Sequence, residues 1–255
     1  MFTSYSAAAL LDLPIIGEWP AEVYTVSRGA HGRRRAGVVE VAQTSTVGLT
    51  AIDGCLVTSV EYTLLQLARH APLVAALTAT DAALHVPRFG GAAPLTTLEH
   101  LRSEHERLKP YPRSRRADAV LARTTSLSET PLETGSRLLI EELGFAAPEL
   151  QHELWLAELG KRAFLDFYWP EVDVGAEADG RGKYRGGGWL VGTTASAVRA
   201  AADAVIAEKD RENAIRRRVS GFDRWDWNEM LGKQPVEARL VRLGVPRVRR
   251  RVILI

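Results

Sequence analysis

Three carboxylate residues stand at a spacing that suits a metal site. Asp166 lies in the middle of an alternating apolar and polar segment, 162–169, and Glu177 and Asp179 lie two residues apart at the end of the next one. Side chains two apart in a strand point to the same face, and a hairpin brings neighbouring strands together. Carboxylate oxygens are the ligands that hard divalent cations prefer, so we expect Mg²⁺ here, with Mn²⁺ as a substitute.

Two further charged residues extend this group. Lys183 follows Asp179 by four residues in a glycine-rich loop, 180–192, and Glu133 lies in the first turn of the preceding predicted helix. The alternative interpretation is that the strand acids cover the solvated face of an antiparallel sheet, and that Glu133 is a first-turn acid stabilised by the helix dipole. Bulky aromatic neighbours of Asp166 and the loop after Asp179 favour a site.

The second half of the chain has a regular predicted order. Helix, three strands, helix and strand follow one another, with a further helix at the end, in the ranges 132–143, 151–159, 162–169, 172–178, 194–218, 222–227 and 235–243. The first half has less regular patterns. Its expected helices are 6–13, 60–69, 72–84 and 96–108, and its expected strands are 22–27, 37–42 and 55–59.

These patterns predict a mixed α+β protein of two domains. Segment 114–131 contains a basic stretch and then serines and threonines ending in proline, which is typical of a connection. We therefore expect a smaller mixed α+β domain over 1–125 and an αβββαβ domain over 126–255. We find no catalytic constellation in the first half.

Composition excludes several classes of protein. The chain has 255 residues, a net charge of +2 and one cysteine, so a disulfide framework and a thiolate metal cluster are excluded. No apolar run is long enough for a membrane span, and no signal peptide is recognisable, so we expect a cytoplasmic protein without membrane contact.

Arginine clusters are the expected contacts to nucleic acid. They suit a phosphate backbone, although an arginine-rich chain also has such clusters as ordinary solvated surface. The candidate nucleic-acid-binding residues are Arg185, Arg211, Arg216, Arg217 and Arg218. A basic turn, Arg33–Arg35, and a basic tail add Arg247, Arg249, Arg250 and Arg251.

Several short motifs together carry a resemblance. They are Pro131-Leu-Glu-Thr-Gly-Ser-Arg-Leu-Leu139, Leu143-Gly-Phe145, Pro148-Glu-Leu-Gln151, Leu165-Asp-Phe-Tyr-Trp-Pro-Glu171 and Glu177-Ala-Asp-Gly-Arg-Gly-Lys-Tyr184. Over 128–232 the chain resembles PD-(D/E)xK nucleases, in particular the Vsr-like endonuclease domain found at the C-terminus of AbiE-type antitoxin-like proteins. Weaker similarity to the middle region of those proteins lies at Ser6-Ala-Ala-Ala-Leu10, Val57-Thr-Ser59, Leu67-Ala-Arg69 and Asp81-Ala-Ala-Leu84; their N-terminal winged helix is not expected here.

The resemblance implies a metal-dependent DNA endonuclease, with a role such as phage defence. Asp166, Glu177 and Glu133 would hold the metal ion, which would activate a water for attack on phosphorus, and Lys183 would orient that water or stabilise the pentavalent charge. Asp179 stands where the family has lysine, and it would act as a further ligand or base. The alternative is a catalytically inactive DNA-binding regulator of the antitoxin type. A protein-interaction module is a third interpretation, and a homodimer is compatible with all three.

Overall fold

The computed structural model describes residues 1–27, 29, 31–43, 45–180 and 195–254. The chain divides into two compact units, Met1–Gly135 together with Leu254–Ile255, and Ser136–Ile253. The described residues form nine α-helices and nine strands in open sheets, which confirms the predicted mixed α+β class. None of the described helices is long and apolar enough to cross a membrane.

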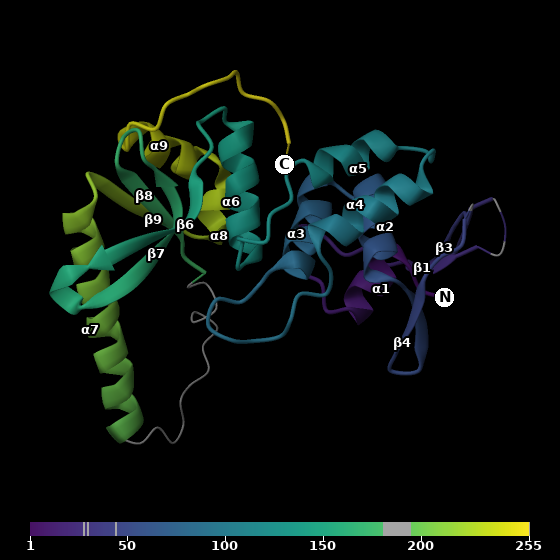
Figure 1. The fold of residues 1–255 in the computed structure, drawn as a ribbon, viewed down its shortest axis with the longest axis horizontal. Coiled ribbons are helices and arrows are strands. Elements are labelled where there is room, and N and C mark those ends of the chain that lie inside the picture. The colour runs from purple at the N-terminus through teal and green to yellow at the C-terminus, as the bar shows by residue number, and fades with distance from the viewer. Residues whose placement is uncertain (28, 30, 44, 181–194, 255) are drawn as a thin grey trace. The chain divides into compact units, whose positions relative to one another are not determined.

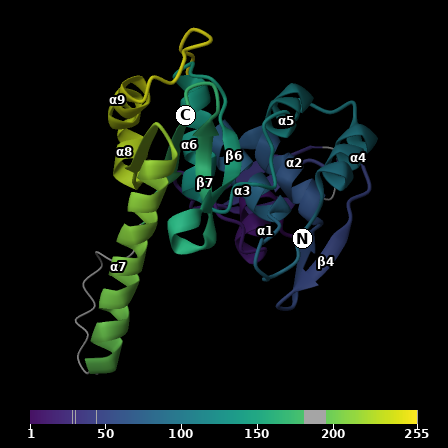
Figure 2. The same cartoon turned by 60° about the vertical axis from the view of Figure 1, so that its left-hand side comes forward.

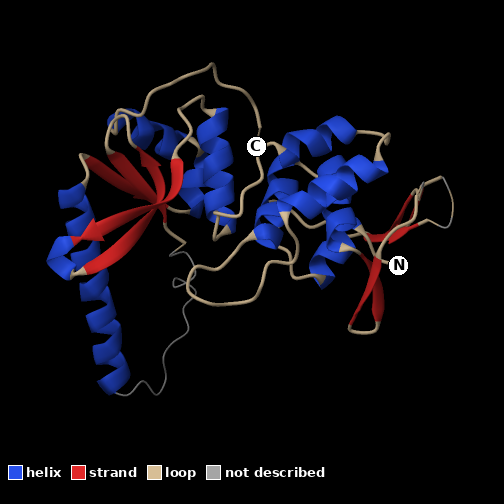
Figure 3. Cartoon of the chain, in the orientation of Figure 1, coloured by secondary structure: helices blue, strands red, loops and turns tan. Residues whose placement is uncertain are grey.

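The described residues of the first unit form five complete helices and five short strands (Figure 3). Its helices are α1 (Ser4–Leu10), α2 (Val60–His70), α3 (Leu73–Leu84), α4 (Leu98–Leu108) and α5 (Ser114–Leu121). Its strands are β1 (Val23–Val26), β2 (Arg33–Arg35), β3 (Val38–Val41), β4 (Leu49–Ile52) and β5 (Cys55–Thr58), paired as β1-β3-β2 and β4-β5. Side-chain caps start two of the helices, because Ser59 accepts from Tyr62 N and Thr97 accepts from His100 N.

The second unit has the predicted order of elements, starting with the C-terminal part of α6 (Pro131–Glu142). Its other elements are β6 (Glu149–Leu156), a 3₁₀ turn (Ala157–Leu159), β7 (Lys161–Trp169), β8 (Val174–Ala178), α7 (Ala195–Arg218), β9 (Gly221–Trp225), α8 (Trp227–Gly232) and α9 (Gln234–Arg242). The sheet has the order β6-β7-β8-β9. Its first two pairings are antiparallel and the last is parallel.

Two helices pack on this sheet, one on either side (Figure 1). Beneath α7 lies a buried apolar cluster of Leu154, Leu156, Ala163, Leu165, Ala214, Ile215, Val219 and Phe222. On the α6 side, Trp225 stacks on Phe167 at 5.5 Å between ring centroids, and its indole N–H donates to Ser136 Oγ of α6 at 2.8 Å. The N-terminal part of α7 extends beyond the sheet (Figure 2).

Three local predictions are wrong. Arg33–Arg35, expected as a turn, forms β2, because Arg34 pairs in register with Val39 of β3. Ser114–Leu121, expected as part of a connection, forms α5, since its apolar residues fall on one buried face. The strand expected to reach Trp227 ends at Trp225, because Asp226 caps the short helix α8 in a capping box with Glu229.

Candidate functional site

The two central candidate acids lie where strands β7 and β8 separate. The ladder between these strands runs from Trp169↔Val174 to Phe167↔Ala176. Beyond that point β7 continues beside β6, and β8 continues beside β9. Asp166 and Glu177 are the next residues of the two strands beyond the last pair of this ladder, so they lie on neighbouring strands, as the sequence predicts. We call this place, formed by Asp166, Glu177 and Ala178, the strand fork.

At the strand fork, Asp166 accepts a hydrogen bond from the main chain. Its Oδ2 accepts a hydrogen bond from the N–H of Ala178 at 2.7 Å, and its Oδ1 accepts one from Gln151 Nε2 at 3.3 Å. In a continued ladder, a backbone carbonyl of β7 would accept the N–H of Ala178. The carboxylate therefore takes the place of a main-chain acceptor where the strands part.

Glu177 is enclosed by two arginines. Its side chain is 11% exposed, and its carboxylate lies 2.6 Å from Arg211 Nη2 and 2.8 Å from Arg224 Nη2. Arg211 reaches the strand fork from α7 and also donates to the carbonyl of Phe164 at 3.3 Å. One guanidinium group thus joins the two diverging strands.

The ion pairs extend along α7. Glu208 lies 2.6 Å from Arg224 and 3.3 Å from Arg211, and Glu212 lies 3.3 Å from Arg224 and 2.8 Å from Arg216. We call these six residues the ion-pair network: Glu177, Glu208, Glu212, Arg211, Arg216 and Arg224. Within it, three negative charges face three positive charges, so no external ion is needed to balance the acids.

The arginine pKa values reflect this pairing. Burial opposes the charge of Arg211, but the hydrogen bond and ion pair with Glu177 outweigh burial, and the pKa of Arg211 is raised. Burial likewise opposes the charge of Arg224, yet Glu177, Glu208 and Glu212 raise its pKa. Both guanidinium groups are therefore held as cations by the carboxylates that the network supplies.

Glu133 has a role at the start of α6, within the first unit. Its Oε1 accepts from Thr130 Oγ1 and its Oε2 from Glu129 N, each at 2.9 Å. The N–H of Glu133 in turn donates to Thr130 Oγ1 at 3.2 Å. These reciprocal bonds resemble a capping box and agree with the alternative prediction of a first-turn acid that stabilises the helix.

The remaining candidate catalytic residues follow β8. The N–H of Asp179 donates to the carbonyl of Trp225 at 2.8 Å, which continues the pairing of β8 with β9 by one residue. Lys183 and the candidate DNA-binding residue Arg185 lie outside the described residues. The structure therefore brings together Asp166, Glu177 and Asp179 on two neighbouring strands of the second unit.

A divalent cation does not fit the strand fork in this arrangement. Among the described residues, no group of three or more His, Cys, Asp or Glu side chains is placed to hold a metal ion. The carboxylate oxygens of Asp166 accept hydrogen bonds from Ala178 and Gln151, and those of Glu177 face two guanidinium groups. Because Mg²⁺ needs several oxygens free to ligate it, we derive no catalytic step through this ion.

Most of the candidate DNA-binding arginines form intramolecular ion pairs. Arg211 and Arg216 belong to the ion-pair network, and Arg217 pairs with Glu158. Arg218 is exposed and forms no ion pair within the described residues, although its charge acts on Asp173. The basic tail is also largely paired: Arg247 and Arg251 contact Glu237, and Arg249 contacts Glu141.

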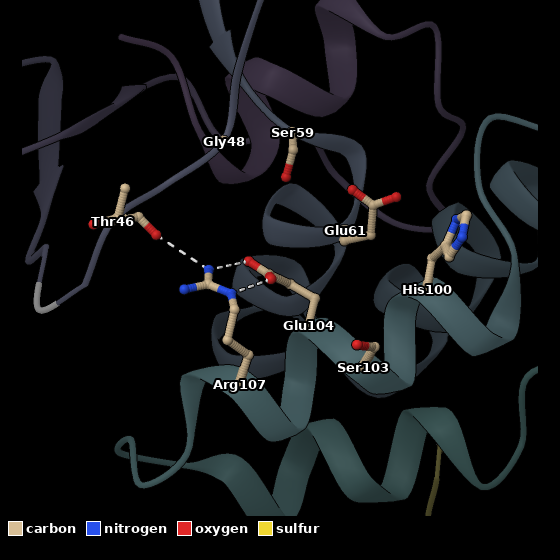
Figure 4. Close-up of a pocket in the computed structure, with 8 residues that line it drawn as sticks. All are labelled: Thr46, Gly48, Ser59, Glu61, His100, Ser103, Glu104 and Arg107. Carbon is tan, nitrogen blue, oxygen red and sulfur yellow. Dashed lines mark hydrogen bonds and ion pairs between the residues drawn. The ribbon is translucent and has the colours of Figure 1, made fainter.

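A polar pocket of about 440 Å³ lies in the first unit (Figure 4). Arg107 crosses it, bound twice to Glu104 at 2.6 Å and once to the carbonyl of Thr46 at 3.1 Å. Glu61 accepts from Thr96, and Ser59 caps α2. Gly48, His100 and Ser103 also line the pocket. The two acids and Ser59 already have partners within the chain.

Sequence reasoning missed Glu208, Glu212 and Arg224 as members of the site. A signal for part of the network is present, since Glu212 and Arg216 are four residues apart on a predicted helix. Arg224 could not be connected to Glu208 in this way, because the pair joins β9 to α7.

The second unit thus belongs to the class of α-β-β-β-α-β domains, with an ion-paired acidic site at the centre of its sheet. No family model matches the chain, and no curated protein and no solved structure is significantly similar to it.

Proposed function

We propose that the chain is a DNA-binding protein of regulatory type, in which the nuclease-like second unit is a scaffold rather than a metal-dependent hydrolase. The observation that carries this proposal is the pairing of Glu177 with Arg211 and Arg224 at 2.6 and 2.8 Å. To act as a catalytic metal ligand, Glu177 would first have to break its ion pairs with Arg211 and Arg224.

Arginine chemistry supports DNA as the partner. A guanidinium group binds carboxylate and phosphate with the same planar geometry, so a phosphodiester can replace a glutamate as the partner of Arg211. Lys209 and Arg218 are exposed residues of α7, and neither forms an ion pair among the described residues. Such cations supply affinity for a phosphate backbone without reading its sequence.

A second candidate function is a metal-dependent endonuclease acting with Mg²⁺ or Mn²⁺. The positions of Asp166 and Glu177 on neighbouring strands favour it, because two such acids are the expected core of a metal site. It requires Glu177 to exchange its arginine partners for a metal ion.

One experiment separates the two functions. Plasmid nicking with Mg²⁺ or Mn²⁺ and duplex binding by fluorescence anisotropy are measured for the wild type and for Glu177→Gln. The proposal predicts no metal-dependent nicking and tighter DNA binding by the variant, because Arg211 and Arg224 lose a carboxylate partner.

The control is Glu153→Gln, which removes the same charge from an exposed pair with Arg162. Metal-dependent nicking that Glu177→Gln abolishes and Glu153→Gln retains would establish the endonuclease instead. Absence of duplex binding by the wild type at low salt would remove DNA as the partner.

A further inference from the structure

A group of arginines in the first unit has no carboxylate partner. We call it the arginine cluster; it consists of Arg69 at the end of α2 and of Arg113, Arg115 and Arg116 at the start of α5. In the part of the chain that the structure describes, no ion pair involves any of them. This cluster differs from the ion-pair network of the second unit, where each arginine faces a glutamate.

Neutral groups hold these arginines instead. Arg69 donates to the carbonyl of Pro112 and to Gln66 Oε1, each at 3.1 Å, and Arg116 donates to the carbonyl of Ala71 at 2.5 Å. Arg113 Nη1 lies 3.1 Å from His70 Nδ1. Because arginine can only donate, His70 accepts through Nδ1 and carries its proton on Nε2. The positive charges are therefore positioned but not neutralised.

The pKa values of His70 and Arg69 reflect the positive charge of the arginine cluster, which no carboxylate balances. Burial and the charges of Arg69, Arg113 and Arg116 lower the pKa of His70 to about 4. Burial also lowers the pKa of Arg69, with repulsion from Arg113 adding to it. In the ion-pair network, by contrast, the pKa values of Arg211 and Arg224 are raised, because their carboxylate partners favour the charged form.

A chain of hydrogen bonds centred on a buried histidine holds the loop that carries the cluster. His105 is buried, and its ring nitrogens contact Tyr111 Oη at 2.5 Å and Asp118 Oδ1 at 2.7 Å. The guanidinium carbon of Arg69 lies 5.0 Å from the centre of the Tyr111 ring. A rigid loop loses little conformational freedom when a ligand binds, which favours binding at this surface.

We propose that Arg69, Arg113 and Arg116 form a binding site for a phosphate group, with Arg115 at its rim. Several guanidinium groups without a counter-charge match an oxyanion that carries more than one charge or many acceptor atoms. His70 adds a donor through its Nε2–H. The phosphate comes either from a nucleic-acid backbone or from a free phosphate compound. This site shares no residue with the strand fork, and it does not depend on the function proposed for the second unit.

The first test uses inorganic phosphate and the full-length chain. NMR signals of the His70 imidazole are followed during the titration, and the affinity is measured by calorimetry. Phosphate is expected to shift these signals and to raise the pKa of His70 toward its ordinary value, because an anion offsets the charge of the arginines. The double variant Arg113→Gln/Arg116→Gln is expected to bind phosphate at least about tenfold more weakly.

The control is Arg102→Gln, which removes an exposed arginine of α4 that likewise has no carboxylate partner among the described residues. Circular dichroism shows whether each variant retains the fold. Equal phosphate affinity of the double variant and the wild type, or His70 signals that do not move at high phosphate concentration, would overturn the proposal.

A second arm identifies the source of the phosphate. Binding of a 20-base-pair duplex, about two helical turns long, is measured between 50 and 200 mM salt. If the phosphate belongs to a nucleic-acid backbone, the double variant lowers the slope of log K against log salt by about two. If only inorganic phosphate binding weakens, the source is a free phosphate compound. Failure of the wild type to bind DNA contradicts the proposed function while the phosphate arm still tests this site.

Discussion

Glu177 of β8 and Arg211 of α7 form an ion pair of 2.6 Å, although 34 positions separate them in the sequence. The sequence assigned the glutamate to a metal ion and the arginine to DNA. Their direct contact means that each residue already satisfies the charge of the other. Any ligand of either residue must therefore compete with this pair.

Loss of the Glu177 carboxylate is expected to destabilise the second unit. Glu177→Gln leaves Arg211 and Arg224 partly desolvated with fewer counter-charges, although Glu208 and Glu212 remain beside them. We expect a loss of about 2–3 kcal/mol in the free energy of unfolding, below the full cost of breaking a buried pair. Urea unfolding measures it. Glu153→Gln, at the exposed pair with Arg162, should change stability by less than about 1 kcal/mol.

The role of Asp166 as a main-chain partner predicts a difference between two substitutions. Asp166→Asn keeps an oxygen that can accept the N–H of Ala178, whereas Asp166→Ala leaves that N–H without its acceptor. The alanine variant should lose about 1–2 kcal/mol more than the asparagine variant. Hydrogen exchange of the Ala178 amide should accelerate in the alanine variant alone. Equal exchange rates in both variants would contradict the role.

Gly144 after α6 is expected to tolerate no side chain. Its φ is +82°, and a Cβ would lie 2.3 Å from the carbonyl oxygen of Arg249. Gly144→Ala combines backbone strain with a clash against main chain, so we expect a loss of at least about 3 kcal/mol. The control is Gly160→Ala, where φ is +59° and no atom lies within 4 Å of the added carbon. It should cost only about 1–2 kcal/mol from strain, as thermal unfolding can measure.

The lowered pKa of His70 predicts a pH dependence of stability. The unfolded chain takes up a proton on this histidine near its ordinary pKa of 6.5, whereas the folded chain does so only near 4. More protons bind to the unfolded state in this window, so His70 makes the protein less stable as the pH falls from about 6.5 to 4. Unfolding free energies across this range should show a weaker dependence in His70→Gln.

The variant Arg113→Ala tests how far the neighbouring arginines lower the pKa of His70. Removal of one of the three facing arginines should raise the pKa of His70 toward 6.5, because repulsion of the protonated imidazole decreases. Histidine titration by NMR tests this expectation directly. An unchanged titration in the variant would show that burial alone lowers the pKa.

The order of elements in the second unit could be predicted because its signals are local. Alternation in β7 and β8 gave the faces of Asp166 and Glu177, and a hairpin gave their neighbouring positions. The alternative interpretation of Glu133 as a first-turn acid was also local, since it depends on Thr130 three residues earlier. Such contacts follow from the geometry of one strand pair or one helix turn.

The ion-pair and hydrogen-bond partners in both units could not be predicted, because they come from elements that are distant in the sequence. Arg224 meets Glu208 only because β9 returns parallel to β8 beneath α7, and Arg69 meets the carbonyl of Pro112 across 43 positions. Spacing along one element contains no information about such contacts. Helix α5 was missed because its eight residues begin within a basic stretch that suggested a loop.

At the strand fork the carboxylate of Asp166 replaces a main-chain acceptor, and this affects what conservation of the residue can mean. The hydrogen bond from the N–H of Ala178 to Asp166 is part of the fold itself, because it joins β8 to β7 where their ladder ends. Invariance of this aspartate among relatives would therefore be expected whether or not they cut DNA. Loss of both Arg211 and Arg224 with an acid retained at position 177 is the more informative evolutionary event, because only then is that carboxylate free for another ligand.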